Sequence, residues 1–218
     1  MSVPTSGQRR TYLKADVRRA QILDVAKDLF ARRGYRVANV ADICEAARIG
    51  RGTLYQYFDN KQAVLLALME DLATRVRRIL EERPKVAAIP DAAQAPPAMI
   101  AAFCQRRLRD VLDAVFIDES TLRLVLREAR GLDGAVDQVI AMIDDLVIAA
   151  MVEDMRAAQK AGVVRKGDPE MIVRFLLGGI EKLVLSALVL DAPVDLDAIC
   201  QTAVELELFG ILNGEGRK

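Results

Sequence analysis

Apolar side chains recur at helical spacing along most of this chain. The first stripe consists of Ile22, Leu23, Ala26, Leu29 and Phe30. This spacing places the apolar groups on one face of a helix. Gly34 follows the last turn, and a glycine at that point favours the left-handed conformation that ends a helix. The pattern therefore predicts a first helix that ends at Gly34.

Two shorter helices and one long helix are predicted next. Asn39 suits the N-cap of a second helix, because its side chain can accept hydrogen bonds from the first turn. After a turn at residues 48–50, a third helix is expected from Arg51 to Phe58, with Phe58 facing the core. Lys61 then opens a longer helix that ends before Pro84.

The pattern along the rest of the chain also predicts helices. Four prolines between residues 84 and 97 predict a loop, and Asp168 and Asp195 suit N-caps. Helices are expected near 97–117, 119–130, 133–161, 168–191 and 195–212. No alternation typical of strands occurs, so the sequence predicts an all-α fold of about nine helices. We expect an N-terminal arm and three-helix helix-turn-helix domain at 1–60 and a larger C-terminal helical bundle domain at 61–218.

Charge is unevenly distributed between these two parts. The whole chain has 31 basic and 31 acidic residues. Residues 1–60 hold eleven basic and six acidic residues, a surplus of five positive charges, so the remainder carries five negative charges. A basic segment on an acidic body favours a polyanionic partner at one end of the molecule.

Composition argues against several other classes. The chain has no histidine, and its three cysteines, Cys44, Cys104 and Cys200, form no CxxC pair. We therefore expect no metal, no cofactor and a cytoplasmic location with reduced, buried cysteines. The apolar run 171–190 is interrupted by Arg174 and by a charged pair at 181–182, which argues against a membrane span.

The N-terminal segment 1–60, called the head below, also carries a recognisable motif, and the segment 61–218 is called the body. Its elements are Ile22-Leu23, Ala26, Leu29-Phe30, Gly34-Tyr35, Asp42-Ile43, Ala46-Ala47, Gly52-Thr53-Leu54-Tyr55, Phe58 and Lys61. Over about 45 residues this pattern resembles the DNA-binding domain of the TetR family of transcriptional regulators. The resemblance implies a homodimer that binds a palindromic operator in double-stranded DNA and, most often, a repressor released by a small molecule.

The resemblance assigns roles to particular residues of the head. Contacts with the DNA backbone are implied for Asn39, Thr53, Tyr55, Tyr57 and Lys61. Approach to base edges is implied for Arg51, Gly52 and Gln56. The chemistry agrees, because the small Gly52 permits close approach, while arginine suits guanine and glutamine suits adenine. We expect the ring of Tyr55 to face inward with its hydroxyl outward.

Two positions depart from the family pattern. Arg48 stands where a glycine is usual, so it either strains the turn or gains a phosphate contact. Gly50 stands where serine or threonine is usual, and it caps a helix less well by a few tenths of a kcal/mol. Neither departure removes the resemblance, and Arg48 is counted among the expected DNA-binding residues.

The middle helices are expected to surround a small-molecule cavity, as the resemblance implies. An aliphatic lining would favour a lipophilic ligand, although the same residues also suit a dry core. The candidate ligand-binding residues are Phe103, Arg107, Leu112, Phe116, Arg123, Leu126, Arg127, Met142 and Leu146.

Residues 172–190 are apolar on nearly all sides, which requires burial by more than one partner surface. With the final helix they suit half of a four-helix bundle across a two-fold axis, with an intrachain core as the alternative. The expected interface residues are Leu176, Gly179, Ile180, Leu183, Ala203 and Val204. The helix that starts at Lys61 is the continuous link between the two parts, so we expect it to transmit ligand binding.

Three other functions stay open at this point. The chain suits a ligand-independent DNA-binding regulator, a helical enzyme that uses the body cavity, or a protein-binding module. The absence of histidine and of paired carboxylates at metal-binding spacing argues against an enzyme. The basic head with its specific motif favours DNA over a protein partner.

Overall fold

A computed structural model describes residues 15–82, 94–115, 131–190 and 192–209, together with Ser120, Leu124 and Ala129. Side chains at 114–115, 188–189 and 207–209 are outside that description. Eight α-helices and no strand occur in these ranges, in agreement with the predicted all-α fold. The helix expected at 119–130 lies almost wholly outside the described residues, and so does the N-terminal arm.

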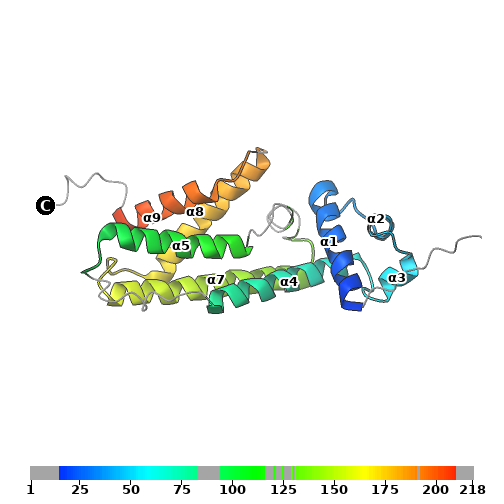
Figure 1. The fold of residues 1–218 in the computed structure, drawn as a ribbon, viewed down its shortest axis with the longest axis horizontal. Coiled ribbons are helices and arrows are strands. Elements are labelled where there is room, and N and C mark those ends of the chain that lie inside the picture. Colours follow the sequence, from blue (N-terminus) through cyan, green and yellow to red (C-terminus); the bar gives the residue numbers. More distant parts are fainter. Residues whose placement is uncertain are drawn as a thin grey trace, which may run out of the picture.

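Three helices form the head at one end of the elongated molecule (Figure 1). They are α1 (Ala15–Arg33), α2 (Val40–Ala46) and α3 (Arg51–Tyr55). Helix α1 ends as expected, because Gly34 has a φ of 83° and donates from its amide to the carbonyl of Phe30. Helix α3 ends three residues earlier than expected. A turn follows it, and Asn60 then accepts from the amide of Ala63 at the start of the next helix.

Five described helices build the body. They are α4 (Lys61–Glu82), α5 (Pro97–Val115), α7 (Gly134–Lys160), α8 (Pro169–Val189) and α9 (Leu196–Phe209). Helices α4 and α7 pack along each other, and α5 packs on α9 (Figure 1). Side chains of Asp133, Asp168 and Asp195 cap α7, α8 and α9 through bonds to first-turn amides.

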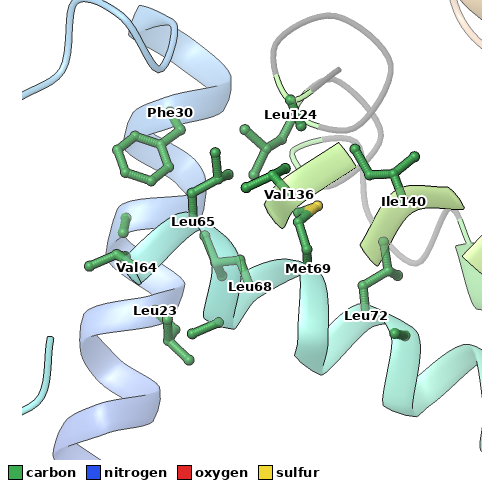
Figure 2. Packing of buried hydrophobic residues seen from close by; sticks show 14 of the residues in the cluster. Leu23, Phe30, Val64, Leu65, Leu68, Met69, Leu72, Leu124, Val136 and Ile140 are labelled. Carbon is green, nitrogen blue, oxygen red and sulfur yellow. The ribbon is translucent and has the colours of Figure 1, made fainter. Parts of the chain in front are cut away.

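One hydrophobic cluster joins the head to the body. Phe30 of α1 and Leu65 and Met69 of α4 are buried with Leu124 and Val136, which come from the body (Figure 2). Because α4 packs against both parts, the core is continuous across the boundary at residue 60. That boundary stays a prediction.

Candidate functional site

The turn between α2 and α3 holds a strained residue. Arg48 has a φ of 54°, in the left-handed region, and its side chain is exposed. A residue with a Cβ adopts this conformation at a cost of about 1–2 kcal/mol. The backbone at Arg48 is therefore strained, which is one of the two alternatives expected. Its exposed side chain leaves the positive charge at the surface. Gly50 is the N-cap of α3, with extended backbone and no side-chain cap.

Helix α3 is anchored by two apolar residues. Leu54 is fully buried, and Phe58, in the turn beyond the helix, is 5% exposed. These two positions fix which face of α3 points outward. Arg51, Gly52 and Gln56 are exposed on that outer face, and Thr53 is half-buried. The residues expected at base edges thus share one accessible surface.

The expectation for the ring of Tyr55 was wrong. Tyr55 is 52% exposed. Its neighbour Tyr57 is half-buried and packs against the hydrophobic cluster instead. The reason is helical register, because Leu54 and Phe58 occupy the inward face and position 55 falls outside it.

Gly52 has open space where a side chain would be. A Cβ added there would meet no atom within 4 Å. The fold of the monomer therefore does not require a glycine at this position, although glycine in a helix costs about 1 kcal/mol relative to alanine. A partner that approaches the outer face of α3 closely would require it.

Asn39 caps α2 as expected. Its Oδ1 accepts from the amides of Ala41 at 2.8 Å and Asp42 at 3.1 Å, while its own amide donates to the Asp42 carboxylate at 2.8 Å. Because the oxygen is occupied, the Nδ2 group is the part of Asn39 suited to a phosphate. Arg33 lies 3.5 Å from the Asp42 carboxylate and offsets its charge at this surface.

Lys61 has a structural role that the sequence did not indicate. Its Nζ donates to the carbonyls of Tyr35 and Ala38, both at 2.7 Å, and lies 4.2 Å from the centre of the Tyr35 ring. Burial lowers the pKa of Lys61. The side chain thus ties the start of α4 to the turn after α1, and a phosphate contact for it stays a prediction.

A cavity of about 80 Å³ lies between α5, α7, α8 and α9. Phe103 and Arg107 line it, as expected. Leu112, Met142 and Leu146 are not among its lining residues. Helix α7 contributes its face at 151, 154, 155 and 158 instead, and Leu112 of α5 is buried in a cluster with Val184 and Cys200. The candidates Phe116, Arg123, Leu126 and Arg127 lie outside the described residues. The full lining is Ile100, Phe103, Cys104, Arg107, Leu108, Val111, Met151, Asp154, Met155, Ala158, Val163, Val164, Val173, Leu176, Ile180, Ala203 and Val204.

The cavity contains one ion pair. The Arg107 guanidinium on α5 bonds the carboxylate of Asp154 on α7, and it also lies 5.3 Å from the centre of the Phe103 ring. Arg107 is 6% exposed. Sequence reasoning missed Asp154, since its partner is 47 residues away on another helix.

Helix α8 presents an exposed apolar stripe. Met171, Phe175 and Leu183 are 67%, 79% and 55% exposed, and Gly179 lies between them at the same spacing of four residues. Of the expected interface residues, Gly179 and Leu183 belong to this stripe, whereas Leu176, Ile180, Ala203 and Val204 line the cavity inside the chain. Sequence reasoning missed Met171 and Phe175, because the inward-facing Ile180 and Val184 belong to a row with the same spacing of four residues.

Two further properties bear on function. In the part of the chain that the structure describes, no helix is both long and apolar enough to cross a membrane. Across the same ranges, acidic and cysteine side chains nowhere gather in threes in a way that suits a metal ion.

The head matches a known sequence family. Residues 22–68 match the profile described as "Bacterial regulatory proteins, tetR family". A transcriptional repressor from Rhodococcus jostii, KstR2, is 42% identical over 67 residues, which cover 29% of this chain and 33% of that protein. The fatty acid metabolism regulator of Bacillus subtilis is 24% identical over 88% of this chain and 95% of its own length.

Solved structures extend the likeness to the whole fold. FadR from Bacillus subtilis in complex with stearoyl-CoA superposes with a TM-score of 0.69 at 22% identity, covering 88% of this chain and 99% of that one. AibR in complex with isovaleryl coenzyme A and operator DNA gives a TM-score of 0.61 at 21% identity, covering 88% and 98%. The arrangement of head and body is therefore one that solved regulators also have.

Proposed function

Because this chain belongs to the TetR family of bacterial regulatory proteins and is a DNA-binding transcriptional regulator, we propose that it is a repressor. In this proposal it binds a palindromic operator as a homodimer and releases it when a small molecule fills the body cavity. The family consists of regulators rather than enzymes, so we assign the cavity no enzymatic role. The cytoplasm, where the DNA is, is the proposed location.

The outer face of α3 is the observation that carries the DNA-binding part. Arg51, Gly52 and Gln56 are exposed together, and Leu54 holds the helix in place from behind. We assign Arg51 and Gln56 to base edges in the major groove. We assign phosphate contacts to Arg48, Thr53, Tyr55 and the side-chain Nδ2 group of Asn39. Such contacts position a protein on DNA without reading its sequence.

Selection of bound fragments from bacterial genomic DNA tests this part. The enriched fragments should share a palindrome whose half-sites are about one helical turn apart, roughly 34–36 Å. Affinity for that palindrome should exceed affinity for random DNA by about 1000-fold or more and should fall as salt rises. Equal binding to random DNA would refute a sequence-specific regulator.

For the effector we propose an acyl thioester whose aliphatic chain occupies the cavity. The support is the largely apolar lining and the two structural relatives that were solved with acyl-CoA molecules. At about 80 Å³ the cavity is small, so a long acyl chain requires the surrounding helices to separate. To release the operator, an acyl-CoA must bind the conformation that cannot bind DNA more tightly than the conformation that can. Equal affinity for the two conformations would leave their populations unchanged.

A ligand-independent regulator is the second candidate, and the small cavity favours it. Titration of the protein–operator complex with acyl-CoAs of increasing chain length separates the two. Release at some chain length supports the effector proposal, whereas an operator affinity that no acyl-CoA alters supports the second candidate.

We propose the exposed stripe on α8 as the dimer interface. The exposed apolar stripe includes Met171, Phe175 and Leu183. Such a contiguous apolar surface is unusual where a helix faces only solvent. Gly179 in the same row would let a second copy of the helix approach closely, since a Cβ there meets no atom within 4 Å in the monomer. Sedimentation at micromolar concentration should give a dimer.

A further inference from the structure

We propose that Gln21 of α1 is a positioning residue for DNA recognition, because it holds the turn between α2 and α3 in the conformation that presents α3. The inference rests on the sequence-specific binding proposed above, and it adds a residue to which no DNA contact is assigned. Gln21 lies 26 residues before the carbonyl group that it bonds. Its effect on DNA binding is therefore exerted through the turn.

The turn has the hydrogen bonds of a Schellman motif at the end of α2. The amide of Arg48 donates to the carbonyl of Glu45 at 3.0 Å. The amide of Ile49 donates to the carbonyl of Cys44 at 2.9 Å. This motif needs a left-handed residue between them, most often glycine, and Arg48 takes that role with a φ of 54°. The turn thus keeps a conformation that is strained at its central residue.

The bond from Gln21 satisfies a carbonyl inside this turn. Its Nε2 donates to the carbonyl oxygen of Ala47 at 3.3 Å. Ala47 is 1% exposed, so that oxygen is shielded from water. Within the described residues no backbone amide donates to it. Because a buried carbonyl without a donor is costly, Gln21 favours the present shape of the turn over shapes that would turn this oxygen to solvent.

Arg18 fixes the direction in which the amide group of Gln21 points. Its Nη1 donates to Oε1 of Gln21 at 2.6 Å, from the preceding turn of the same helix. Because an arginine donates and does not accept, the oxygen of this amide faces Arg18 and the nitrogen faces Ala47. The two bonds agree on one orientation of the side chain, through which α1 supports the turn.

The turn in its place determines where α3 lies. Helix α3 is five residues long and starts three residues after Arg48, and its N-cap, Gly50, provides no side-chain bond. A change of the backbone at Arg48 therefore moves the whole helix, and with it Arg51 and Gln56. Base contacts require exact placement, whereas attraction to phosphates does not, so loss of the support should weaken operator binding more than binding to random DNA.

The variant Gln21→Met tests this role, because methionine has a similar length and helix propensity but donates no hydrogen bond. The charge of the head is unchanged. We expect operator affinity to fall about tenfold, while affinity for random DNA stays within about threefold of the wild type. Equal losses on the two DNAs, or no loss on either, would overturn the proposal.

A second substitution separates this positioning role from a general effect on stability. In an Arg48→Gly background the turn keeps its left-handed residue without strain, so it depends less on support from Gln21. Adding Gln21→Met to Arg48→Gly should then change operator affinity by less than about threefold relative to Arg48→Gly alone. A loss of about tenfold in both backgrounds would show that Gln21 acts independently of the turn, and would refute the inference.

Hydrogen exchange of backbone amides provides a measurement without DNA. In Gln21→Met the amides of Arg48 and Ile49 should exchange about tenfold faster than in the wild type, because the turn opens more often. The amide of Gly34, which bonds the carbonyl of Phe30 at the far end of α1, is the control and should keep its wild-type rate. Unchanged exchange at Arg48 and Ile49 would overturn the proposal.

The variant Gln21→Glu gives an independent check should Gln21→Met be unfolded. Its carboxylate still accepts from Arg18 but cannot donate to Ala47. The same two turn amides should exchange faster, and the ratio of operator to random-DNA affinity should fall. If the wild type prefers no DNA sequence, the sequence-specific function proposed above is refuted, and the proposal that Gln21 presents α3 for recognition is refuted with it. Wild-type specificity with no change of the ratio in Gln21→Glu would refute the positioning role alone.

Discussion

The ammonium group of Lys61 donates a hydrogen bond to the carbonyl oxygen of Tyr35 at 2.7 Å and lies 4.2 Å from the centre of the same residue's ring. With the second bond, to Ala38, these contacts close the turn between α1 and α2 over the start of α4. A lysine whose position suggested a phosphate contact therefore also holds the head together.

Replacing Lys61 with methionine should lower the free energy of unfolding by about 2 kcal/mol, because two carbonyls lose a charged donor. Urea denaturation measures this loss. Operator and random DNA should both bind more weakly, and a flatter salt dependence, by about one in slope, would indicate an additional phosphate contact. Arg78→Met is the control, since it removes an exposed charge from the same helix. Wild-type stability of Lys61→Met would contradict the structural role.

Gly52→Ala should change stability and DNA affinity in opposite directions. The added methyl group meets open space and improves helix propensity, so the free energy of unfolding should rise by about 0.5–1 kcal/mol. Operator affinity should fall by roughly tenfold, because the methyl group stands between α3 and the groove. Denaturation and DNA shift assays measure the two effects. Gly134→Ala at the start of α7 should leave operator affinity unchanged.

Two substitutions at Arg48 separate strain from charge. Both Arg48→Gly and Arg48→Ala remove the positive charge, but glycine alone adopts a φ of 54° without strain. The glycine variant should be more stable than the alanine variant by about 1 kcal/mol. The two should lose DNA affinity equally if Arg48 contributes its charge. Equal stability of the pair would show that the turn relaxes when Arg48 is replaced.

Gly179→Leu should convert a dimer to a monomer while the chain stays folded. The side chain has space in the monomer but would overpack a crossing of two α8 helices. Sedimentation should show the monomer, and affinity for the palindrome should drop sharply. Arg174→Leu adds the same side chain outside the exposed stripe and should leave the dimer intact. A dimeric Gly179→Leu variant would place the interface elsewhere.

Gln62→Ala should weaken the coupling between cavity and DNA. Hydrogen bonds from the amide of Ala135 and from the side chain of Gln62, at the start of α4, lower the pKa of Asp133, the N-cap of α7. No residue of α4 lines the cavity among those described, whereas α7 does. Helices α5 and α7 both line the cavity and both pack against α4, so a signal from a bound ligand would reach α4 through them. The expectation that α4 transmits ligand binding stays a prediction.

The measurement for Gln62→Ala is an acyl-CoA titration of the protein–operator complex. Operator affinity without ligand should stay within about threefold of the wild type, and release should require more ligand. Gln138→Ala, an exposed change on α7, is the control. Unaltered release by Gln62→Ala would show that the coupling follows another route.

Local features of this fold follow from the sequence. The glycine after α1 and the caps at Asn39, Asp168 and Asp195 depend on neighbouring residues, so their patterns are visible along the chain. Strain at Arg48 was one of two alternatives that the family resemblance implied, because a glycine is usual at that position.

Features that depend on packing were not foreseen. Lys61 bonds carbonyls 26 and 23 residues earlier, and backbone acceptors leave no signal in side-chain patterns. Helix α8 is apolar on nearly all sides, so its sequence does not state that Ile180 faces inward and Phe175 outward. The pairing of Arg107 with Asp154 likewise depends on how α5 and α7 meet.

The cluster that joins Phe30 and Leu65 to Val136 has a practical consequence for chimeric regulators. A head cut out at residue 60 and fused to another body loses the apolar surface that covers α1 on its inner side. Moving operator specificity onto a foreign sensor therefore requires the residues of this joint core as well, which are those of α4 from Lys61 to Leu72 together with Leu124, Ala129 and Val136. We expect a chimera joined beyond this shared core to keep a folded head, and a chimera joined at residue 60 to lose it.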